Sequence, residues 1–176
     1  MRIIDFTGQE NIRSEGHTSK GDQPKWKQAG NWYKADHMGY EALSEIIVSR
    51  LLAWSDADDF VSYQPVRIHY NGKVVSGCSS RDFMRKGEML IPFERLHRAY
   101  EGRGLAQTLT RVDSPTARIA YTVDFVERVT NLTGVGAYLT SILELDCLTL
   151  NEDRHTNNLA VLRNEETKTF RLCPIF

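Results

Sequence analysis

The sequence has 176 residues, enough for one domain of ordinary size or for one domain and part of a second. Its 22 Lys and Arg against 23 Asp and Glu give a formal net charge of −1, so no general basic field favours direct nucleic-acid binding or an anionic membrane. No apolar run approaches the roughly 20 residues of a membrane-spanning helix, and the N-terminus lacks the apolar core of a signal peptide. We therefore expect a cytoplasmic chain. Its three cysteines form no Cys-x-x-Cys pair and should be reduced thiols.

Residues 1–29 are polar and contain several glycines, which predicts loops with at most short strands. Ser19, Lys20 and Gly21 lie in a run of small and polar residues that could bring backbone N–H groups close to phosphates. The run has neither the Walker spacing nor Gly-x-Gly-x-x-Gly. From these residues alone a hairpin turn is the better interpretation.

Aromatic residues at 31–36 favour a strand that carries Lys34 near its end. From 39 to 54, apolar residues at helical intervals predict an amphipathic helix with one buried face: Leu43, Ile46, Ile47, Leu51 and Leu52. Glu41 and Glu45 lie one turn apart on this helix, so either carboxylate could reach Lys34 and hold it toward a phosphate. The alternative for Lys34 is a solvated strand lysine, the commoner fate of a single Lys.

Asn71 and Gly72 separate two apolar stretches and form a strong hairpin signal, because a type I′ turn needs positive φ at both central residues. We therefore expect residues 66–70 and 73–78 to pair as antiparallel strands. With the preceding strand and helix, they would make a small sheet with one helix.

The second half of the sequence is mainly helical in pattern. One helix is expected after Pro92, and a second is capped by Ser114 with Pro115 at its first position. A third, at about 135–150, is apolar over most of its surface and should lie in a core. Asp146 lies within this helix, and we expect it to be a paired carboxylate rather than a catalytic one.

A polar loop follows this helix, and within it Asp153 precedes Asn158 by five positions. This is the Asp-x-x-x-x-Asn spacing of phosphotransferase catalytic loops, in which the aspartate reaches the attacking hydroxyl and the asparagine oxygen reaches a magnesium ion. Asp and Asn are also common turn residues, so a hydrogen-bonded turn explains the bare spacing equally well. Leu159 to Leu162 then predict a strand.

The fuller stretch, Asp153-Arg154-His155 with Asn158 and the apolar strand after it, resembles the catalytic loop of HipA-like serine/threonine kinases and, more distantly, that of phosphatidylinositol 3/4-kinases. The resemblance implies an α+β, protein-kinase-like two-lobe fold. The N-lobe, a small antiparallel sheet plus a helix, would take residues 1–83, and part of a helical C-lobe residues 84–176. It also implies ATP and Mg²⁺ as cofactors and a protein substrate.

The same resemblance implies the site residues. Asp153 and Asn158 are expected to be catalytic, with Asn158 also a metal ligand, and His155 is expected to support the shape of the loop. The residues expected to bind the nucleotide are Lys34, Glu41 as its favoured partner, Ser19, Lys20 and Gly21 as a phosphate loop, and Phe83 and Met84 near the adenine. Two consecutive apolar residues such as Phe83 and Met84 are, however, more often simply core.

Residues 170–176 resemble the strand that leads into the metal-binding aspartate of HipA-like kinases, and the sequence ends there. We therefore expect the N-terminal portion of a kinase, silent by itself, whose apolar helix at about 135–150 lacks part of its cover. The chain should associate, be covered by an antitoxin-like or complementing partner chain, or expose an apolar patch. The alternative is a non-catalytic, pseudokinase-like module that binds nucleotide or a partner protein. A phosphoinositide substrate is less favoured because no basic or amphipathic membrane face is evident.

Overall fold

The computed structural model describes residues 2–12, 23–37, 39–57 and 59–176. The chain divides into two compact units. Unit 1 comprises Met1–Phe83 together with Phe176, and unit 2 comprises Met84–Ile175.

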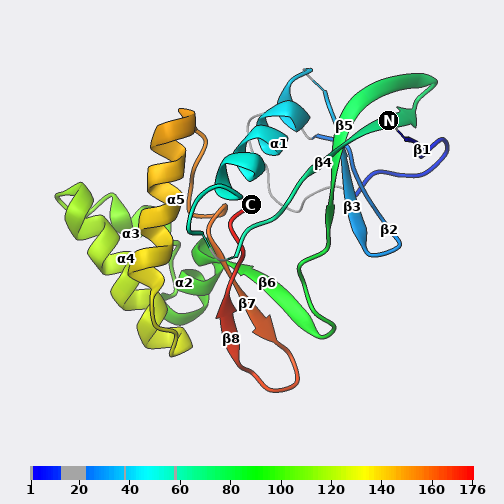
Figure 1. The fold of residues 1–176 in the computed structure, drawn as a ribbon. Helices are drawn as coiled ribbons and strands as arrows, with labels where there is room; N and C mark the ends of the chain where they lie inside the picture. Colours follow the sequence, from blue (N-terminus) through cyan, green and yellow to red (C-terminus); the bar gives the residue numbers. More distant parts are fainter. Residues whose placement is uncertain (1, 13–22, 38, 58) are drawn as a thin grey trace. The chain divides into compact units, whose positions relative to one another are not determined.

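Unit 1 is built on a five-stranded sheet of order β1-β4-β5-β3-β2 (Figure 1). Its strands are β1 (Ile3–Asp5), β2 (Lys25–Gln28), β3 (Asn31–Ala35), β4 (Gln64–Tyr70) and β5 (Lys73–Arg81). β1 runs parallel to β4, and the other neighbours are antiparallel. The predicted hairpin is confirmed: Tyr70 pairs with Lys73, and Asn71 and Gly72 have φ of 50° and 71°.

One face of this sheet is covered by aromatic and β-branched side chains. The ring of Phe6 stacks on that of Trp26 with centroids 4.7 Å apart, and Ile68 is fully buried beside them. Gly77 of β5 allows this close packing, because a Cβ there would lie 2.5 Å from the carbonyl oxygen of Lys34 and 2.7 Å from Cδ1 of Ile68.

The helix α1 (Glu41–Leu52) packs against β4 and β5 (Figure 1). It begins close to its predicted start, but its predicted buried face is wrong in part. The helix buries Ala42, Ser49 and Leu52. By contrast, Leu43, Ile47 and Leu51 are exposed. Near the start of α1, the side toward the sheet carries Ala42, which packs against Val61, Tyr63 and Cys78 and leaves little room for a larger side chain.

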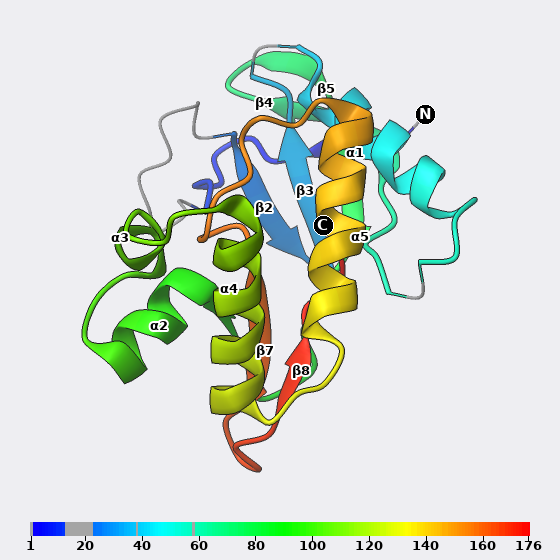
Figure 2. The ribbon, with the colours of Figure 1, turned by 90° about the vertical axis from the view of Figure 1, so that its left-hand side faces the viewer.

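Unit 2 combines a three-stranded sheet with four helices. The antiparallel sheet has the order β6 (Glu88–Pro92), β7 (Ala160–Asn164), β8 (Phe170–Leu172). The helices are α2 (Phe93–Glu101), α3 (Leu105–Leu109), α4 (Pro115–Thr130) and α5 (Val135–Thr149). The predicted cap of α4 is confirmed, since the Ser114 hydroxyl accepts the Ala117 N–H at 3.1 Å. Figure 2 shows α4 and α5 side by side.

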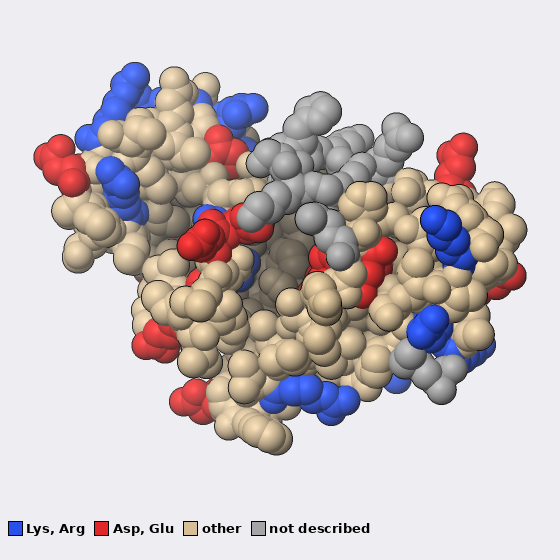
Figure 3. Space-filling view, turned by 90° about the horizontal axis from the view of Figure 1, so that it is seen from above, with Lys and Arg blue, Asp and Glu red and all other residues tan. Residues whose placement is uncertain are grey.

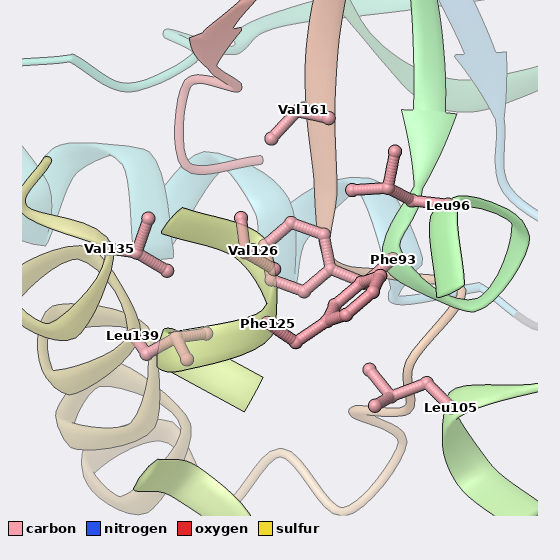
Figure 4. Close-up of a cluster of buried hydrophobic side chains, with 8 residues drawn as sticks. All are labelled: Phe93, Leu96, Leu105, Phe125, Val126, Val135, Leu139 and Val161. Carbon is pink, nitrogen blue, oxygen red and sulfur yellow. The ribbon is translucent and has the colours of Figure 1, made fainter. Parts of the chain in front are cut away.

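The core of unit 2 gathers side chains from β7 and all four helices (Figure 4). Its buried members are Phe93, Leu96, Leu105, Phe125, Val126, Val135, Leu139 and Val161. The predicted place of α5 in the core is confirmed for one side of the helix, which contributes Val135 and Leu139. This side faces α4, and Leu143 and Leu148 on the other side are 38% and 71% exposed.

No helix in the described part of the chain has the length and apolar character needed to cross a membrane. On the face seen in Figure 3, Lys and Arg side chains are interspersed with Asp and Glu. This mixture agrees with the formal net charge of −1.

Candidate functional site

Lys34 on β3 lies in an ion pair with Glu45 of α1. Its Nζ is 2.7 Å from Glu45 Oε1 and donates to the Tyr63 hydroxyl at 3.1 Å. The Lys34 and Glu45 side chains are only 20% and 27% exposed, so Lys34 is not the solvated strand lysine of the alternative interpretation. The pair connects the sheet of unit 1 to its helix.

The second oxygen of Glu45 accepts a hydrogen bond from the Cys78 thiol, with Sγ 3.1 Å from Oε2. Cys78 is the cross-strand partner of Lys34 on β5, so β3 and β5 both bind the same carboxylate. Burial is the largest single effect on Lys34 and opposes its charge, but the charge of Glu45, the Tyr63 hydroxyl and the hydrogen bonds to both together outweigh it and raise the pKa of Lys34. Burial, reinforced by Glu45, also raises the pKa of the Cys78 thiol. Lys34 therefore remains a cation beside a neutral thiol.

The partner of Lys34 differs from the one that the resemblance favours. The Glu41 carboxylate accepts backbone N–H groups of Gly39 and Tyr40 at 2.9 and 3.1 Å, at the start of α1. Glu45, one turn later, forms the ion pair with Lys34. The one-turn spacing of Glu41 and Glu45 allowed either carboxylate to pair with Lys34. Which of them does so depends on where α1 begins relative to the sheet.

Asp36 helps to set that position. Its Oδ1 accepts the Ala42 N–H at 2.7 Å, which satisfies a backbone donor in the first turn of α1. Burial raises the pKa of Asp36, although the hydrogen bond from Ala42 opposes the shift. Sequence reasoning missed this residue, because Asp36 lies four residues before the N-cap, Tyr40, where a capping side chain is not expected.

The structure says less about the other residues that are predicted to bind the nucleotide. Phe83 packs against the buried cluster of Ala42, Val61, Tyr63 and Cys78. It therefore has the core position that is the commoner one for two consecutive apolar residues. Met84 is half-buried in the connection from β5 to β6. Contact of either residue with an adenine stays a prediction. Ser19, Lys20 and Gly21 lie outside the described residues.

In unit 2, the loop that follows α5 is fastened by Asp146. Arg154 donates to this carboxylate through two nitrogens, with Nε 2.7 Å from Oδ2 and Nη2 2.8 Å from Oδ1. The Asn151 amide nitrogen adds a bond of 2.7 Å to Oδ1. The prediction that Asp146 is a paired carboxylate is confirmed, and its pairing fixes both ends of the segment 151–154.

Asp153 and Asn158 lie in the same loop and are connected through its backbone. The Asn158 amide nitrogen donates to the Asp153 carbonyl oxygen at 3.3 Å, and the Asn158 N–H donates to the His155 carbonyl at 2.8 Å. The hydrogen-bonded turn of the alternative interpretation is therefore present. Asp153 is exposed, and the turn leaves the Asn158 side-chain oxygen as an acceptor, so the turn and the catalytic roles are compatible.

Glu94 of α2 is a second anchor of this loop that sequence reasoning missed. Its Oε2 accepts both the Thr156 hydroxyl and the Ala106 N–H of α3, each at 2.8 Å. Gly104 makes room for it, because a Cβ there would lie 1.9 Å from Glu94 Oε1. Glu94 and Thr156 are 62 residues apart, so no local pattern could have indicated the pair.

Among residues 2–12, 23–37, 39–57 and 59–176, no group of three or more His, Cys, Asp or Glu is arranged to hold a metal ion. A magnesium ion would not need such a group. It usually keeps several waters and binds through nucleotide phosphates and one or two protein oxygens. The role of the Asn158 oxygen as a magnesium ligand stays a prediction.

No model of a known protein family matches the sequence, and no curated protein matches it significantly. The structure is similar to the crystal structure of a Helicobacter pylori proinflammatory kinase, CtkA, with a TM-score of 0.62 and 20% sequence identity. The match covers 98% of this chain and 59% of that kinase, so the chain spans somewhat more than half of its length. At this identity the likeness concerns the fold alone. The chain has an α+β, protein-kinase-like fold, with an N-lobe-like unit of sheet and helix followed by part of a helical lobe.

Proposed function

We propose that this chain supplies the nucleotide-binding and catalytic-loop residues of an ATP-dependent phosphotransferase, a HipA-like serine/threonine kinase that acts on a protein hydroxyl. The observation that carries the proposal is the largely buried Lys34–Glu45 ion pair between β3 and α1. Protein kinases require such a pair of strand lysine and helix glutamate to position the phosphates of ATP. The kinase-like fold supports the same conclusion.

In unit 1, Lys34 donates hydrogen bonds to phosphate oxygens of the nucleotide. Glu45 keeps the ammonium group charged and limits its rotation, and the Tyr63 hydroxyl restrains it from the side. The Cys78 thiol holds the second oxygen of Glu45, so the carboxylate cannot turn away without losing that bond. This arrangement positions the lysine before the nucleotide arrives, which lowers the entropy cost of binding.

In unit 2, Asp153 accepts the proton of the acceptor hydroxyl, and the Asn158 oxygen would hold a magnesium ion. Such an ion would neutralise the charge that develops on the transferring phosphate. The anchors Asp146 and Glu94 hold the loop in one conformation, so that Asp153 and Asn158 keep their separation during the reaction. We also propose that an antitoxin-like or complementing partner chain binds this chain.

Calorimetric titration with MgATP tests the nucleotide half of the proposal. Lys34→Met should weaken binding at least about tenfold, because it removes the charge opposite the phosphates at little cost in packing. Lys73→Met, which removes the same charge from an exposed position on β5, is the matched control and should bind as the parent does. A Lys34→Met variant that keeps the parent affinity would remove Lys34 from the site.

The two glutamates give a second comparison. Glu45→Gln should weaken MgATP binding, since it deprives Lys34 of its counter-ion. Glu41→Gln, one turn away on the same helix, should leave the affinity within about threefold of the parent value. The reverse order would mean that Glu41 becomes the partner of Lys34 when nucleotide is bound.

A further inference from the structure

The outer side of α1 carries a continuous row of large apolar side chains, which we call the α1 stripe: Tyr40, Leu43, Ile47, Leu51 and Trp54. Their exposed fractions are 75%, 52%, 49%, 37% and 89%. Spacings of three and four residues place these side chains on one side of the helix and its adjoining turns.

The stripe is unusual because α1 and its flanking residues expose five large apolar side chains. The side toward the sheet carries Ala42, Glu45 and Ser49 together with Leu52. Ile46 packs against the buried cluster of Ala42, Val61, Tyr63 and Cys78. The stripe exposes on the order of 600 Å² of mainly apolar surface, the upper end of what a soluble monomer shows. A surface of this kind marks an interaction site.

The stripe has the same order of side-chain types when it is followed from either end: aromatic, leucine, isoleucine, leucine, aromatic. Tyr40 lies seven residues before Ile47 and Trp54 seven after it, while Leu43 and Leu51 lie four before and four after. Two such helices packed antiparallel around a two-fold axis at Ile47 would place aromatic against aromatic and leucine against leucine. A two-fold interface requires this kind of self-complementarity, because the same patch serves both subunits.

We propose that the α1 stripe is the interface of a homodimer in which α1 packs antiparallel on α1 of a second copy. Ile47 faces Ile47 of the partner subunit, and Leu43 faces Leu51 of the partner subunit. The two copies together bury roughly 1,200 Å², the lower limit for a specific interface, so the dimer is weak and dissociates in the micromolar range.

The inference does not rest on the proposed kinase activity. Glu45 lies on the opposite side of α1 from Ile47, so the dimer covers the stripe while the Lys34–Glu45 pair stays within its own subunit. Substitutions in the stripe should therefore leave MgATP affinity at the parent value. Loss of dimerisation and loss of nucleotide binding are separate outcomes.

Sedimentation equilibrium of the 176-residue chain at about 1 to 100 μM tests the dimer directly. The parent should show a monomer–dimer equilibrium. Ile47→Glu should raise the dissociation constant at least about tenfold, because it places two carboxylates against each other at the axis. Leu148→Glu, at a 71% exposed leucine of α5, is the control and should leave the equilibrium unchanged.

A charge exchange tests the antiparallel register. Leu43→Glu and Leu51→Lys should each weaken the dimer, and the double variant should recover most of the affinity, since each glutamate then faces a lysine of the partner subunit. Within one chain the two positions are eight residues apart and do not pair. Unchanged far-UV circular dichroism would show that the variants fold.

Three results would overturn the proposal. They are a parent chain that stays monomeric throughout the concentration range, a dimer that Leu148→Glu disrupts and Ile47→Glu does not, and a double variant that is weaker than both single variants. The last result would indicate a parallel pairing, with like charges opposed.

Discussion

Replacing Asp146 by Ala should loosen the loop that carries Asp153 and Asn158. The Asp146 and Arg154 side chains are only 9% and 16% exposed and share two short hydrogen bonds. Removing one partner leaves the other charge nearly buried without a counter-ion, which costs about 3 kcal/mol. Asp146 lies in the last turn of α5, where a negative charge opposes the helix dipole, so roughly 0.5 kcal/mol of that loss is recovered.

Amide hydrogen exchange measures this effect where it occurs. Individual amides report the local opening of the loop itself, whereas unfolding by denaturant reports on a whole unit. The backbone N–H of Asn158 donates to the His155 carbonyl oxygen within the loop, and that of Asn151 donates to the Asp146 carbonyl oxygen at the end of α5. Their protection should fall by about 50-fold in Asp146→Ala if they exchange by opening of this loop.

A double-mutant cycle of Asp146→Ala and Arg154→Ala measures the interaction free energy between these two side chains. Once Asp146 is gone, Arg154→Ala should cost little, which gives a coupling free energy of about 2 kcal/mol. Glu144→Ala, at an exposed acidic residue of α5, is the control for a general change in helix charge. Additive single effects, or protection that is unchanged in Asp146→Ala, would refute the role of the pair as the anchor of the loop.

Two further predictions concern stability. The Arg171 hydrogen bonds lower the pKa of Glu88 from 4.5 to about 2, so their stabilisation is present above the unfolded-state pKa and is lost as the pH falls toward 2. Urea unfolding of the parent should lose about 2 kcal/mol between pH 5 and pH 2.5 that Glu88→Gln does not lose, and parallel pH profiles would contradict this. Gly77→Ala should lower the free energy of unfolding by about 2 kcal/mol, because its Cβ would meet backbone at 2.5 Å. Gly136→Ala, whose nearest contact is 3.9 Å away in a helix, should instead be neutral or stabilising, and equal losses for both variants would contradict the steric cause.

The elements that could be predicted from the sequence are those with local signals. Asn71-Gly72 specifies a turn of two residues, and Ser114-Pro115 specifies a helix start, so each is read from adjacent positions. The order of strand, helix and hairpin around Lys34 likewise follows from short stretches. The spacing of Asp153 and Asn158 identified the loop but not what holds it.

The features that could not be predicted depend on contacts between distant positions. β6 has no strong pattern of its own and is a strand because β7, some 70 residues later, pairs with it. Glu45 is preferred over Glu41 because of where Asp36 fixes the start of α1, and Glu94 meets Thr156 only in the folded unit. The exposed side of α1 was taken for a buried one because helical periodicity shows that apolar residues share a side, not which side faces the sheet.

The phosphotransferase proposal is tested most directly by following the backbone amides of the chain by NMR during a titration with MgATP. The amides of Lys34 and Glu45 in unit 1 and those of Asp153 and Asn158 in unit 2 should shift with one common dissociation constant, and Asn158→Ala should weaken the effect of magnesium. Shifts confined to one unit, different dissociation constants for the two groups, or no response to MgATP would contradict the proposal.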